Sequence, residues 1–312
     1  MPLIDVHAHF LPPHYRDALA TAGIDQPDGF PRVPTWSADD HVGVMDRLGI
    51  DAAVLSVSSP GVRFGDGVSA SDAIALARYV NDVAATTIAD HPGRFGAFAS
   101  LPMTDTDESL AEMERALDGL GLDGINVLTN VGGVYLGDAS LDPIMAELNR
   151  RQALVFIHPT SPACWECTSL GYPRPMIEFP FDTTRAVTNM LLSGVFARYP
   201  DIRWIVPHAG GTLPFLAPRI AGISVLLGAD DPAAVVSQLR RLYYDLAGSA
   251  SSAVVTSLLT LVDRHQVLYG SDWPFTPEPI VAGALGWITG TDNPVSAAEL
   301  MANAAPLFPR FE

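Results

Sequence analysis

Eight short apolar runs, rich in valine, isoleucine and aromatic residues, alternate along the chain with stretches of helical periodicity. The apolar runs are Leu3–Phe10, Ala52–Val57, Phe95–Leu101, Gly124–Leu128, Ala153–His158, Arg203–His208, Leu242–Leu246 and Val267–Ser271. The helical stretches include Ser71–Asp90, Asp107–Gly119, Asp142–Arg151, Asp182–Ala197 and Ser251–Arg264. Near-continuous apolar strands joined by helices indicate a parallel sheet that is covered on its outside. The pattern therefore predicts an α/β fold, a (β/α)₈ TIM barrel, with a doubly wound open sheet as the alternative.

No linker or low-complexity segment interrupts this alternation, so we expect a single domain over residues 1–312. Long segments follow the first, second and fifth predicted strands, at Leu11–Trp36, Ser58–Ala70 and Pro159–Phe181. In such a barrel the loops after the strands form the active face, so these segments are expected to build a substrate pocket. Predicted helix caps are Ser37, Ser71 and Asp182.

The charge balance restricts the class of partner. The chain has 35 acidic against 18 basic residues, a net charge of −17, which disfavours nucleic acid and anionic membranes as partners and favours a small molecule. All 18 basic residues are arginine, which excludes a Schiff-base lysine or a carbamylated lysine that bridges two metals. The chain starts directly with a strand pattern and has no long apolar run, so we expect a cytoplasmic protein.

The two cysteines form one isolated CxxC pair, Cys164 and Cys167. Such a pair can be a redox couple or half of a zinc site, but it has neither a second pair nor a thioredoxin-like context. We interpret it as two reduced loop cysteines that can still line a pocket.

The first strand ends in Asp5-Val6-His7-Ala8-His9. Alternate side chains of a strand share a face, so His7 and His9 point the same way. Two adjacent imidazoles suit zinc or manganese, which need one or two further nitrogen or oxygen ligands. His158, His208 and Asp272 end the fifth, sixth and eighth strands, and these ends meet at one face of a barrel.

Four motifs in this order resemble the amidohydrolase superfamily: Asp5–His9, Ile157-His158-Pro159, Val206-Pro207-His208-Ala209-Gly210-Gly211 and Gly270-Ser271-Asp272-Trp273-Pro274. More narrowly, they are similar to the branch of aminocarboxymuconate-semialdehyde, γ-resorcylate and salicylate-type decarboxylases. The resemblance implies that His7, His9, His158 and Asp272 hold one divalent metal, Zn²⁺ first and Mn²⁺ as the alternative. It also implies that His208 stands near the open position, to orient or deprotonate a water or to donate a proton.

The remaining histidines have simpler interpretations. We expect His14, His41, His91 and His265 to be satisfied polar or surface side chains. Asp5 has the parity of His7 and His9 but lies deeper, so we expect a hydrogen-bonded structural role rather than ligation.

A carboxylate substrate calls for arginine, which binds it with two parallel hydrogen bonds. Relatives of the muconate-semialdehyde type place an arginine after the His-Gly-Gly motif, reaching the pocket of the neighbouring subunit. Arg219 stands at the matching position after the His-Gly-Gly motif, and the resemblance therefore implies a homodimer. The alternative interpretation, that Arg219 is only an exposed arginine on a helix surface, stays open. A second arginine of these relatives is replaced by Gly43, and this departure speaks against their substrate.

Other loop residues are candidate substrate contacts. Arg63 and Arg174 are candidates to replace the missing arginine, and Trp36, Trp165 and Phe275 are candidate flat walls for a ring or else packing anchors.

The first hypothesis is a metal-dependent, non-oxidative decarboxylase of an ortho-hydroxybenzoate-like or related unsaturated acid, with His208 or Asp272 moving the proton. The second is a metal-dependent hydrolase of a lactone or similar ester at the same site. A non-catalytic barrel is disfavoured, because stability alone does not explain a full ligand set at strand ends.

Overall fold

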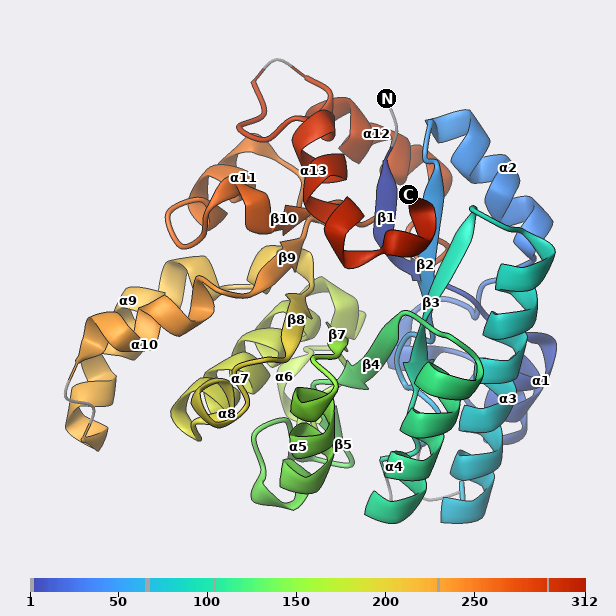
Figure 1. Cartoon of the computed structure of the whole chain (residues 1–312), viewed down its shortest axis with the longest axis horizontal. Coiled ribbons are helices and arrows are strands. Elements are labelled where there is room, and N and C mark those ends of the chain that lie inside the picture. Colours follow the sequence, from blue (N-terminus) through green and yellow to red (C-terminus); the bar gives the residue numbers. More distant parts are fainter. Residues whose placement is uncertain (1–2, 65–67, 104, 229–230, 291) are drawn as a thin grey trace.

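The computed structural model describes residues 3–64, 68–103, 105–228, 231–290 and 292–312 (Figure 1). Residues 65–67 of the predicted loop Ser58–Ala70 lie outside these ranges. None of the described helices is both long and apolar enough to cross a membrane.

Eight parallel strands form a nearly closed barrel. In spatial order they are β1 (Ile4–His9), β2 (Ala52–Ser56), β3 (Phe95–Ser100), β4 (Gly124–Leu128), β7 (Leu154–His158), β8 (Arg203–Val206), β9 (Tyr243–Asp245) and β10 (Val267–Leu268). Between the last strand and the first, the Val6 amide donates to the Tyr269 carbonyl at 3.0 Å. The His9 amide donates to the Trp273 carbonyl at 2.8 Å. The predicted TIM barrel is confirmed.

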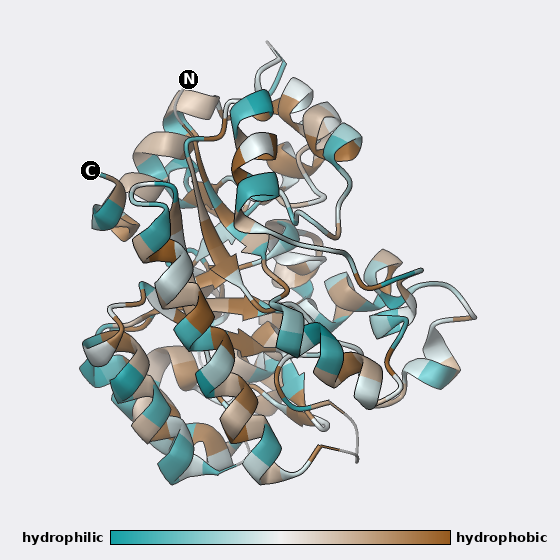
Figure 2. Cartoon of the chain, turned by 90° about the vertical axis from the view of Figure 1, so that its right-hand side faces the viewer, coloured by the Kyte–Doolittle hydropathy of each residue, from teal (hydrophilic) through white to brown (hydrophobic). Residues whose placement is uncertain are grey.

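Helices surround the strands, and Figure 2 shows the most hydrophobic residues on the strands inside them. The α-helices are α1 (Pro13–Thr21), α2 (Ala38–Leu48), α3 (Ala70–Asp90), α4 (Thr106–Glu114), α5 (Asp142–Arg150), α6 (Trp165–Thr168), α7 (Glu178–Leu192), α8 (Val195–Arg198), α9 (Leu213–Ser224), α10 (Pro232–Leu239), α11 (Ser252–Leu258), α12 (Glu278–Ile288) and α13 (Ala297–Ala304). Helices α9 and α10 project from the body as an arm, at the left of Figure 1.

Two of the three predicted caps need correction. Ser37 caps α2 as expected, accepting from the Asp40 amide. Helix α3 is capped by Ser69 rather than Ser71, and its hydroxyl accepts from the Asp72 amide. Helix α7 begins at Glu178, so Asp182 lies within the helix and does not cap it. The Asp182 carboxylate is buried and accepts hydrogen bonds from residues distant in the sequence. These donors are the Thr129 and Tyr135 hydroxyls and the Asn130 amide.

Other differences concern element ends. A small hairpin of β5 (Asn130–Val131) and β6 (Val134–Tyr135) follows β4 and was not predicted, because each of its strands has only two residues. The stretch Asp182–Ala197 divides into α7 and α8 at Gly194, whose φ of 80° breaks the helix. Helix α11 ends at Leu258, short of the predicted Arg264.

Candidate active site

Four side chains that lie far apart in the sequence meet at the ends of the strands. His7 and His9 lie on β1, His158 ends β7, and Asp272 follows β10. One ligand atom from each of these four residues lies within 4.8 Å of the others. The three histidines are buried and the Asp272 side chain is 23% exposed. The structure therefore brings together the four residues predicted to bind a metal.

Hydrogen bonds assign the tautomers of the three histidines. His7 Nδ1 lies 3.0 Å from Asp245 Oδ2, His9 Nδ1 lies 3.2 Å from the Ser56 carbonyl, and His158 Nδ1 lies 2.7 Å from the Pro159 carbonyl. Each acceptor requires a proton on Nδ1, which leaves Nε2 with a free lone pair. Three lone pairs and the Asp272 carboxylate thus point to one place, and a cation there relieves their mutual repulsion.

The separations suit a metal ion of ordinary size. His9 Nε2 lies 3.0 Å from Asp272 Oδ1 and 3.2 Å from His7 Nε2. Ligand atoms about 2.1 Å from a common ion lie roughly 3 Å apart when they are neighbours in its coordination shell. Three imidazoles and one carboxylate are a donor set for Zn²⁺ or Mn²⁺. The group therefore fits a divalent ion.

At His9, His158 and Asp272 the local electrostatics favour the protonation states that metal ligands need. Burial lowers the pKa of His158 well below its usual range, and it also lowers the pKa of His9. Burial acts in the same direction on His7, but Asp245 outweighs it and raises the pKa of His7. Burial opposes ionisation of Asp272, yet the neighbouring imidazoles of His208 and His9 hold its pKa well below the usual range. The carboxylate is ionised at neutral pH.

Asp245 is a functional position that the sequence reading missed. It ends β9, and besides His7 it accepts from the His208 amide at 3.1 Å and the Ala247 amide at 2.9 Å. A Cβ on Gly270 would lie 2.7 Å from His7 Cβ and 3.1 Å from Asp245 Oδ1, so only glycine fits beside this pair. The available signal was a carboxylate at the end of the seventh predicted strand.

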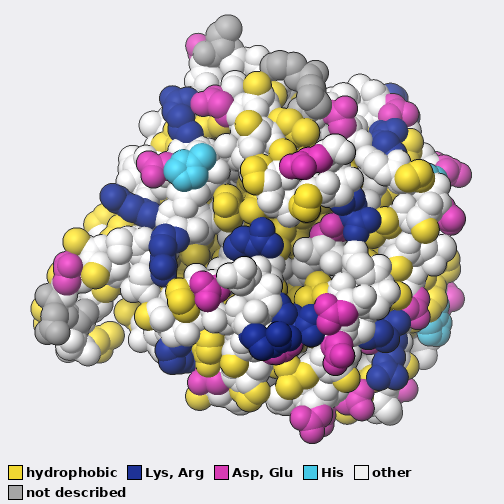
Figure 3. All heavy atoms as spheres, viewed as in Figure 1, with side chains coloured by type: hydrophobic (Ala, Val, Ile, Leu, Met, Phe, Trp, Pro, Cys, Tyr) yellow, Lys and Arg dark blue, Asp and Glu magenta, His cyan; other side chains and the backbone are white. Residues whose placement is uncertain are grey.

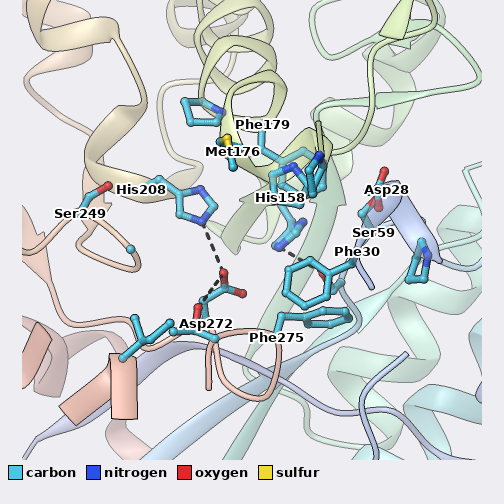
Figure 4. Close-up of a pocket in the computed structure, with 18 of the residues that line it drawn as sticks. Asp28, Phe30, Ser59, His158, Met176, Phe179, His208, Ser249, Asp272 and Phe275 are labelled. Atoms are coloured by element: carbon cyan, nitrogen blue, oxygen red, sulfur yellow. Dashed lines mark hydrogen bonds and ion pairs between the residues drawn. The ribbon is translucent and has the colours of Figure 1, made fainter. Parts of the chain in front are cut away.

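His208 follows β8 and faces Asp272 (Figure 4). Its Nε2 lies 3.9 Å from Asp272 Oδ2, and its φ of 54° places it in the left-handed region. His208 Nδ1 is buried without a hydrogen-bond partner among the described residues. His208 is thus placed to exchange a proton with a ligand in the cavity.

A cavity of about 490 Å³ opens above these residues. Its lining consists of Pro27, Asp28, Phe30, Ser58, Ser59, His158, Pro173, Pro175, Met176, Phe179, Pro180, His208, Gly248, Ser249, Asp272, Phe275, Thr276, Pro277 and Ile280. Phe275 is therefore in the wall, as predicted for a flat substrate contact. No arginine occurs in the part of the lining that the structure describes. The volume and the apolar wall suit an aromatic ring.

Trp36 lies elsewhere. It is not among the described residues of the cavity wall, and its Nε1 donates to His41 Nδ1 at 3.1 Å. The His41 ring lies 4.2 Å from the ring of Trp273, the neighbour of Asp272. Burial lowers the pKa of His41 to about 3, so this histidine is neutral. The tryptophan supports the turn that carries Asp272 instead of forming a substrate wall.

Arg63 and Arg174 line a second, adjoining cavity of about 870 Å³, which shares Pro27 and Asp28 with the first. The Arg174 guanidinium lies 4.0 Å above the Trp165 ring. Arg219 is exposed on α9 and lines neither cavity in this chain. Cys164 and Cys167 are free and exposed, and neither lines either cavity.

Asp5 and the other histidines stand apart from the ligand group. Asp5 is buried and accepts from the His7 and Ser271 amides, each at 3.0 Å, and burial raises its pKa to about 7. His41 is buried, whereas His14 and His265 are exposed and His91 is half-buried.

Comparison with known proteins places this site in a family. The family model described as Amidohydrolase matches residues 4–309. The 6-methylsalicylic acid decarboxylase of Penicillium expansum is 35% identical over 320 residues, which cover 100% of this chain and 98% of that protein.

Two solved structures have the same fold. A protein named amidohydrolase II superposes with a TM-score of 0.90 at 32% identity, covering 98% of this chain and 99% of the other. The 5-carboxyvanillate decarboxylase of Novosphingobium aromaticivorans, in complex with manganese and a nitrobenzoic acid, superposes with a TM-score of 0.85 at 21% identity, covering 98% and 96%. The chain belongs to the amidohydrolase family, in the branch that contains the hydroxybenzoate-type decarboxylases.

Proposed function

We propose that the chain is a metal-dependent, non-oxidative decarboxylase of an ortho-hydroxybenzoate-like or related unsaturated carboxylic acid. The observation that carries this proposal is the convergence of three Nε2 lone pairs and one carboxylate beneath an apolar cavity, with His208 beside them. The similarity to the 6-methylsalicylic acid decarboxylase supports the same reaction type.

A divalent ion held by His7, His9, His158 and Asp272 would supply positive charge to the carboxylate and phenolic oxygens of the substrate. The protein residues do the remaining work. Phe275 and the apolar side chains of the wall hold the ring and exclude water from it. The buried setting strengthens every electrostatic interaction with the bound acid.

The reaction needs one proton on the ring carbon that bears the carboxylate. His208 Nε2 and Asp272 Oδ2, 3.9 Å apart, are the two groups placed to deliver it, and Asp272, which is ionised at neutral pH, would first have to receive a proton. Protonation of that carbon interrupts the aromatic system; the bond to the carboxylate then breaks, its electron pair returns to the ring, and CO₂ leaves. His208 Nδ1 has no hydrogen-bond partner among the described residues, so no described protein group fixes which ring nitrogen carries the proton.

The identity of the ion is part of the proposal. Three imidazoles favour Zn²⁺, and a carboxylate with oxygen-donor substrates suits Mn²⁺ as well. Metal-free protein reloaded with each ion should recover activity, and the ion that also co-purifies with the protein is the native one.

Cationic side chains at the mouth of the site are proposed to attract the anionic substrate as it approaches. Arg63 and Arg174 in the adjoining cavity offset the overall negative charge along the approach. Arg219 is proposed to act from a second copy of the chain. The projecting arm formed by α9, α10 and the segment between them exposes large apolar side chains, with Phe215 at 83%, Leu226 at 83% and Leu227 at 71% exposure; Figure 3 shows apolar atoms on this arm among polar and charged ones. Such a surface is typical of a subunit contact, which supports a homodimer.

The function is tested by incubating metal-loaded protein with hydroxybenzoates, unsaturated semialdehyde acids and lactones, and following product masses. A product lighter by one CO₂ supports the proposal. A product heavier by one water would instead establish the hydrolase. Sedimentation of wild-type protein and of Leu226→Glu tests the dimer, and cell fractionation tests the predicted cytoplasmic location.

A further inference from the structure

Asp28 is a buried carboxylate in the cavity wall that the proposed reaction does not use. It is 8% exposed and lines the catalytic cavity. Figure 4 shows it on the opposite side of the site from His208 and Ser249. The other ionisable residues of the described lining are His158, His208 and Asp272, which belong to the metal side. Asp28 is therefore the one ionisable group in the described wall that lies away from the metal ligands.

The surrounding residues hold this carboxylate in place. Asp28 has a φ of 53° and a ψ of 24°, a left-handed conformation that is uncommon outside glycine. The Ser161 hydroxyl donates to Asp28 Oδ1, and Arg174 Nε donates to the Ser161 oxygen at 2.9 Å. Arg174 is itself stacked on Trp165. The chain of contacts fixes one carboxylate oxygen of Asp28.

The second oxygen remains available. Among the described residues, no donor is within hydrogen-bond distance of Asp28 Oδ2, although the side chain lines the cavity. An ionised carboxylate only accepts hydrogen bonds, and Asp28 Oδ2 is not among the buried side-chain atoms that lack a partner, so it is open to a ligand. A ligand that places a donor there gains a charge-assisted hydrogen bond.

We propose that Asp28 is a specificity-determining residue, which selects an aromatic acid carrying a second hydrogen-bond donor, a hydroxyl or an amino group, on the ring edge away from the metal. This inference rests on the proposed function, because that function fixes which end of the acid faces the metal ligands. The negative charge of Asp28 also rejects a second carboxylate at the same ring position.

The test compares substrates that differ only at the distal edge. They are ortho-hydroxybenzoate, the same acid with a second hydroxyl opposite either the carboxylate or the first hydroxyl, and the same acid with a second carboxylate at those positions. The variants are Asp28→Gly and Asp28→Asn, because glycine and asparagine both tolerate the left-handed backbone. Asp25→Asn is the matched control, since Asp25 is an exposed residue of the same loop that lines only the adjoining cavity.

Wild-type protein should prefer the second hydroxyl, measured as a ratio of kcat/KM values. In Asp28→Gly this ratio should fall about tenfold to a hundredfold, the usual effect of losing a hydrogen bond to a charged group. In Asp28→Asn this ratio of kcat/KM values should fall less than in Asp28→Gly. The same variant should turn over the dicarboxylic acids faster than wild-type protein. Asp25→Asn should keep the wild-type ratio. A ratio that changes by less than about threefold in Asp28→Gly overturns the proposal, even if both kcat/KM values fall together.

Failure of the proposed function gives a different result. If no acid loses CO₂, calorimetric titration of metal-loaded protein with phenol and with dihydroxybenzenes still tests Asp28. The preference for the second hydroxyl should then appear in the dissociation constants and should be lost in Asp28→Gly. Equal binding of the two kinds of phenol to wild-type protein overturns the inference independently of the reaction.

Discussion

The floor and the outer wall of the cavity are built differently. In the floor, His7, His9 and His158 are buried, and each Nδ1 is paired with a carbonyl or with Asp245. In the wall, Phe275 stands on a turn and Asp28 in a short 3-10 segment, Pro27–Gly29, both outside the strands, and Phe275 is partly exposed. The floor is fixed by strand backbone, whereas the wall is fixed by side-chain contacts between loops. Changes in the floor should therefore abolish the reaction, and changes in the wall should redirect it.

The largest expected effect is at the floor. His158→Ala removes one ligand from a buried site whose other groups cannot move to replace it, so metal binding and CO₂ release should be lost together, the latter by about a thousandfold or more. Metal content by mass spectrometry and product formation are the two measurements. His265→Ala changes an exposed histidine and is the control. Full metal content and activity in His158→Ala would refute the ligand set.

The next largest effect is expected on the stability of the folded protein in acid, and it depends on the buried residue His41. His41 has its pKa lowered by burial to about 3, against about 6.5 in the unfolded chain. The unfolded state therefore binds an extra proton below pH 6.5, so the folded state loses stability as the pH falls from about 6.5 to 3. This loss amounts to roughly 5 kcal/mol.

The variant His41→Gln keeps an acceptor for the Trp36 indole but cannot titrate. The free energy of unfolding of this variant should fall less steeply with acid than that of wild type. Denaturant unfolding at pH 7, 5.5 and 4 measures the difference. Parallel pH profiles for the two proteins would show that His41 is not the buried neutral group described here.

A smaller effect is expected at Asp245, which contacts the floor residue His7. Asp245→Asn replaces the carboxylate that fixes the His7 tautomer, and loss of such a partner typically weakens metal affinity tenfold to a hundredfold. Competition with a chelator measures the affinity, and circular dichroism checks the fold. Asp263→Asn, an exposed aspartate after α11, is the control. An unchanged metal affinity would mean that backbone geometry alone orients His7.

The smallest effect is expected in the adjoining cavity. With ortho-hydroxybenzoate, which has no second donor for Asp28, Arg174→Ala should raise KM about threefold to tenfold and leave kcat nearly unchanged, because the guanidinium aids approach and does not touch the reacting atoms. Steady-state kinetics at low and high salt test this, since screening should remove the difference. A fall in kcat with unchanged KM would show that Arg174 acts on the reaction itself, as the residues of the floor do.

Much of the floor was predictable from two simple rules. Alternate side chains of a strand share a face, and the ends of parallel strands meet at one face of a barrel. His7 and His9 share a face by strand alternation, and His158, His208 and Asp272 follow predicted strands whose ends meet at one face of a barrel. Asp245 obeys the same rule and was missed because its strand showed no motif. That residues 1–312 form a single domain stays a prediction.

The wall was not predictable in the same way. Trp36 and Arg174 lie in long segments after strands, as expected, yet one packs on His41 and the other lines a neighbouring cavity. Position in a loop does not determine the direction of a side chain, because loop geometry depends on contacts between segments distant in sequence. Asp28 illustrates this, since Ser161 and Arg174 hold it from more than a hundred residues away.

The sequence by itself determined the barrel, the strand end near which each proposed metal ligand lies and the family of the chain, because hydrophobic periodicity and local motifs are properties of short segments. The tertiary structure decided the tautomers of the histidines, the partnership of Asp245 with His7 and the inclusion of Asp28 in the cavity wall. These depend on distances between separate segments, and such distances are set only when the whole chain is packed.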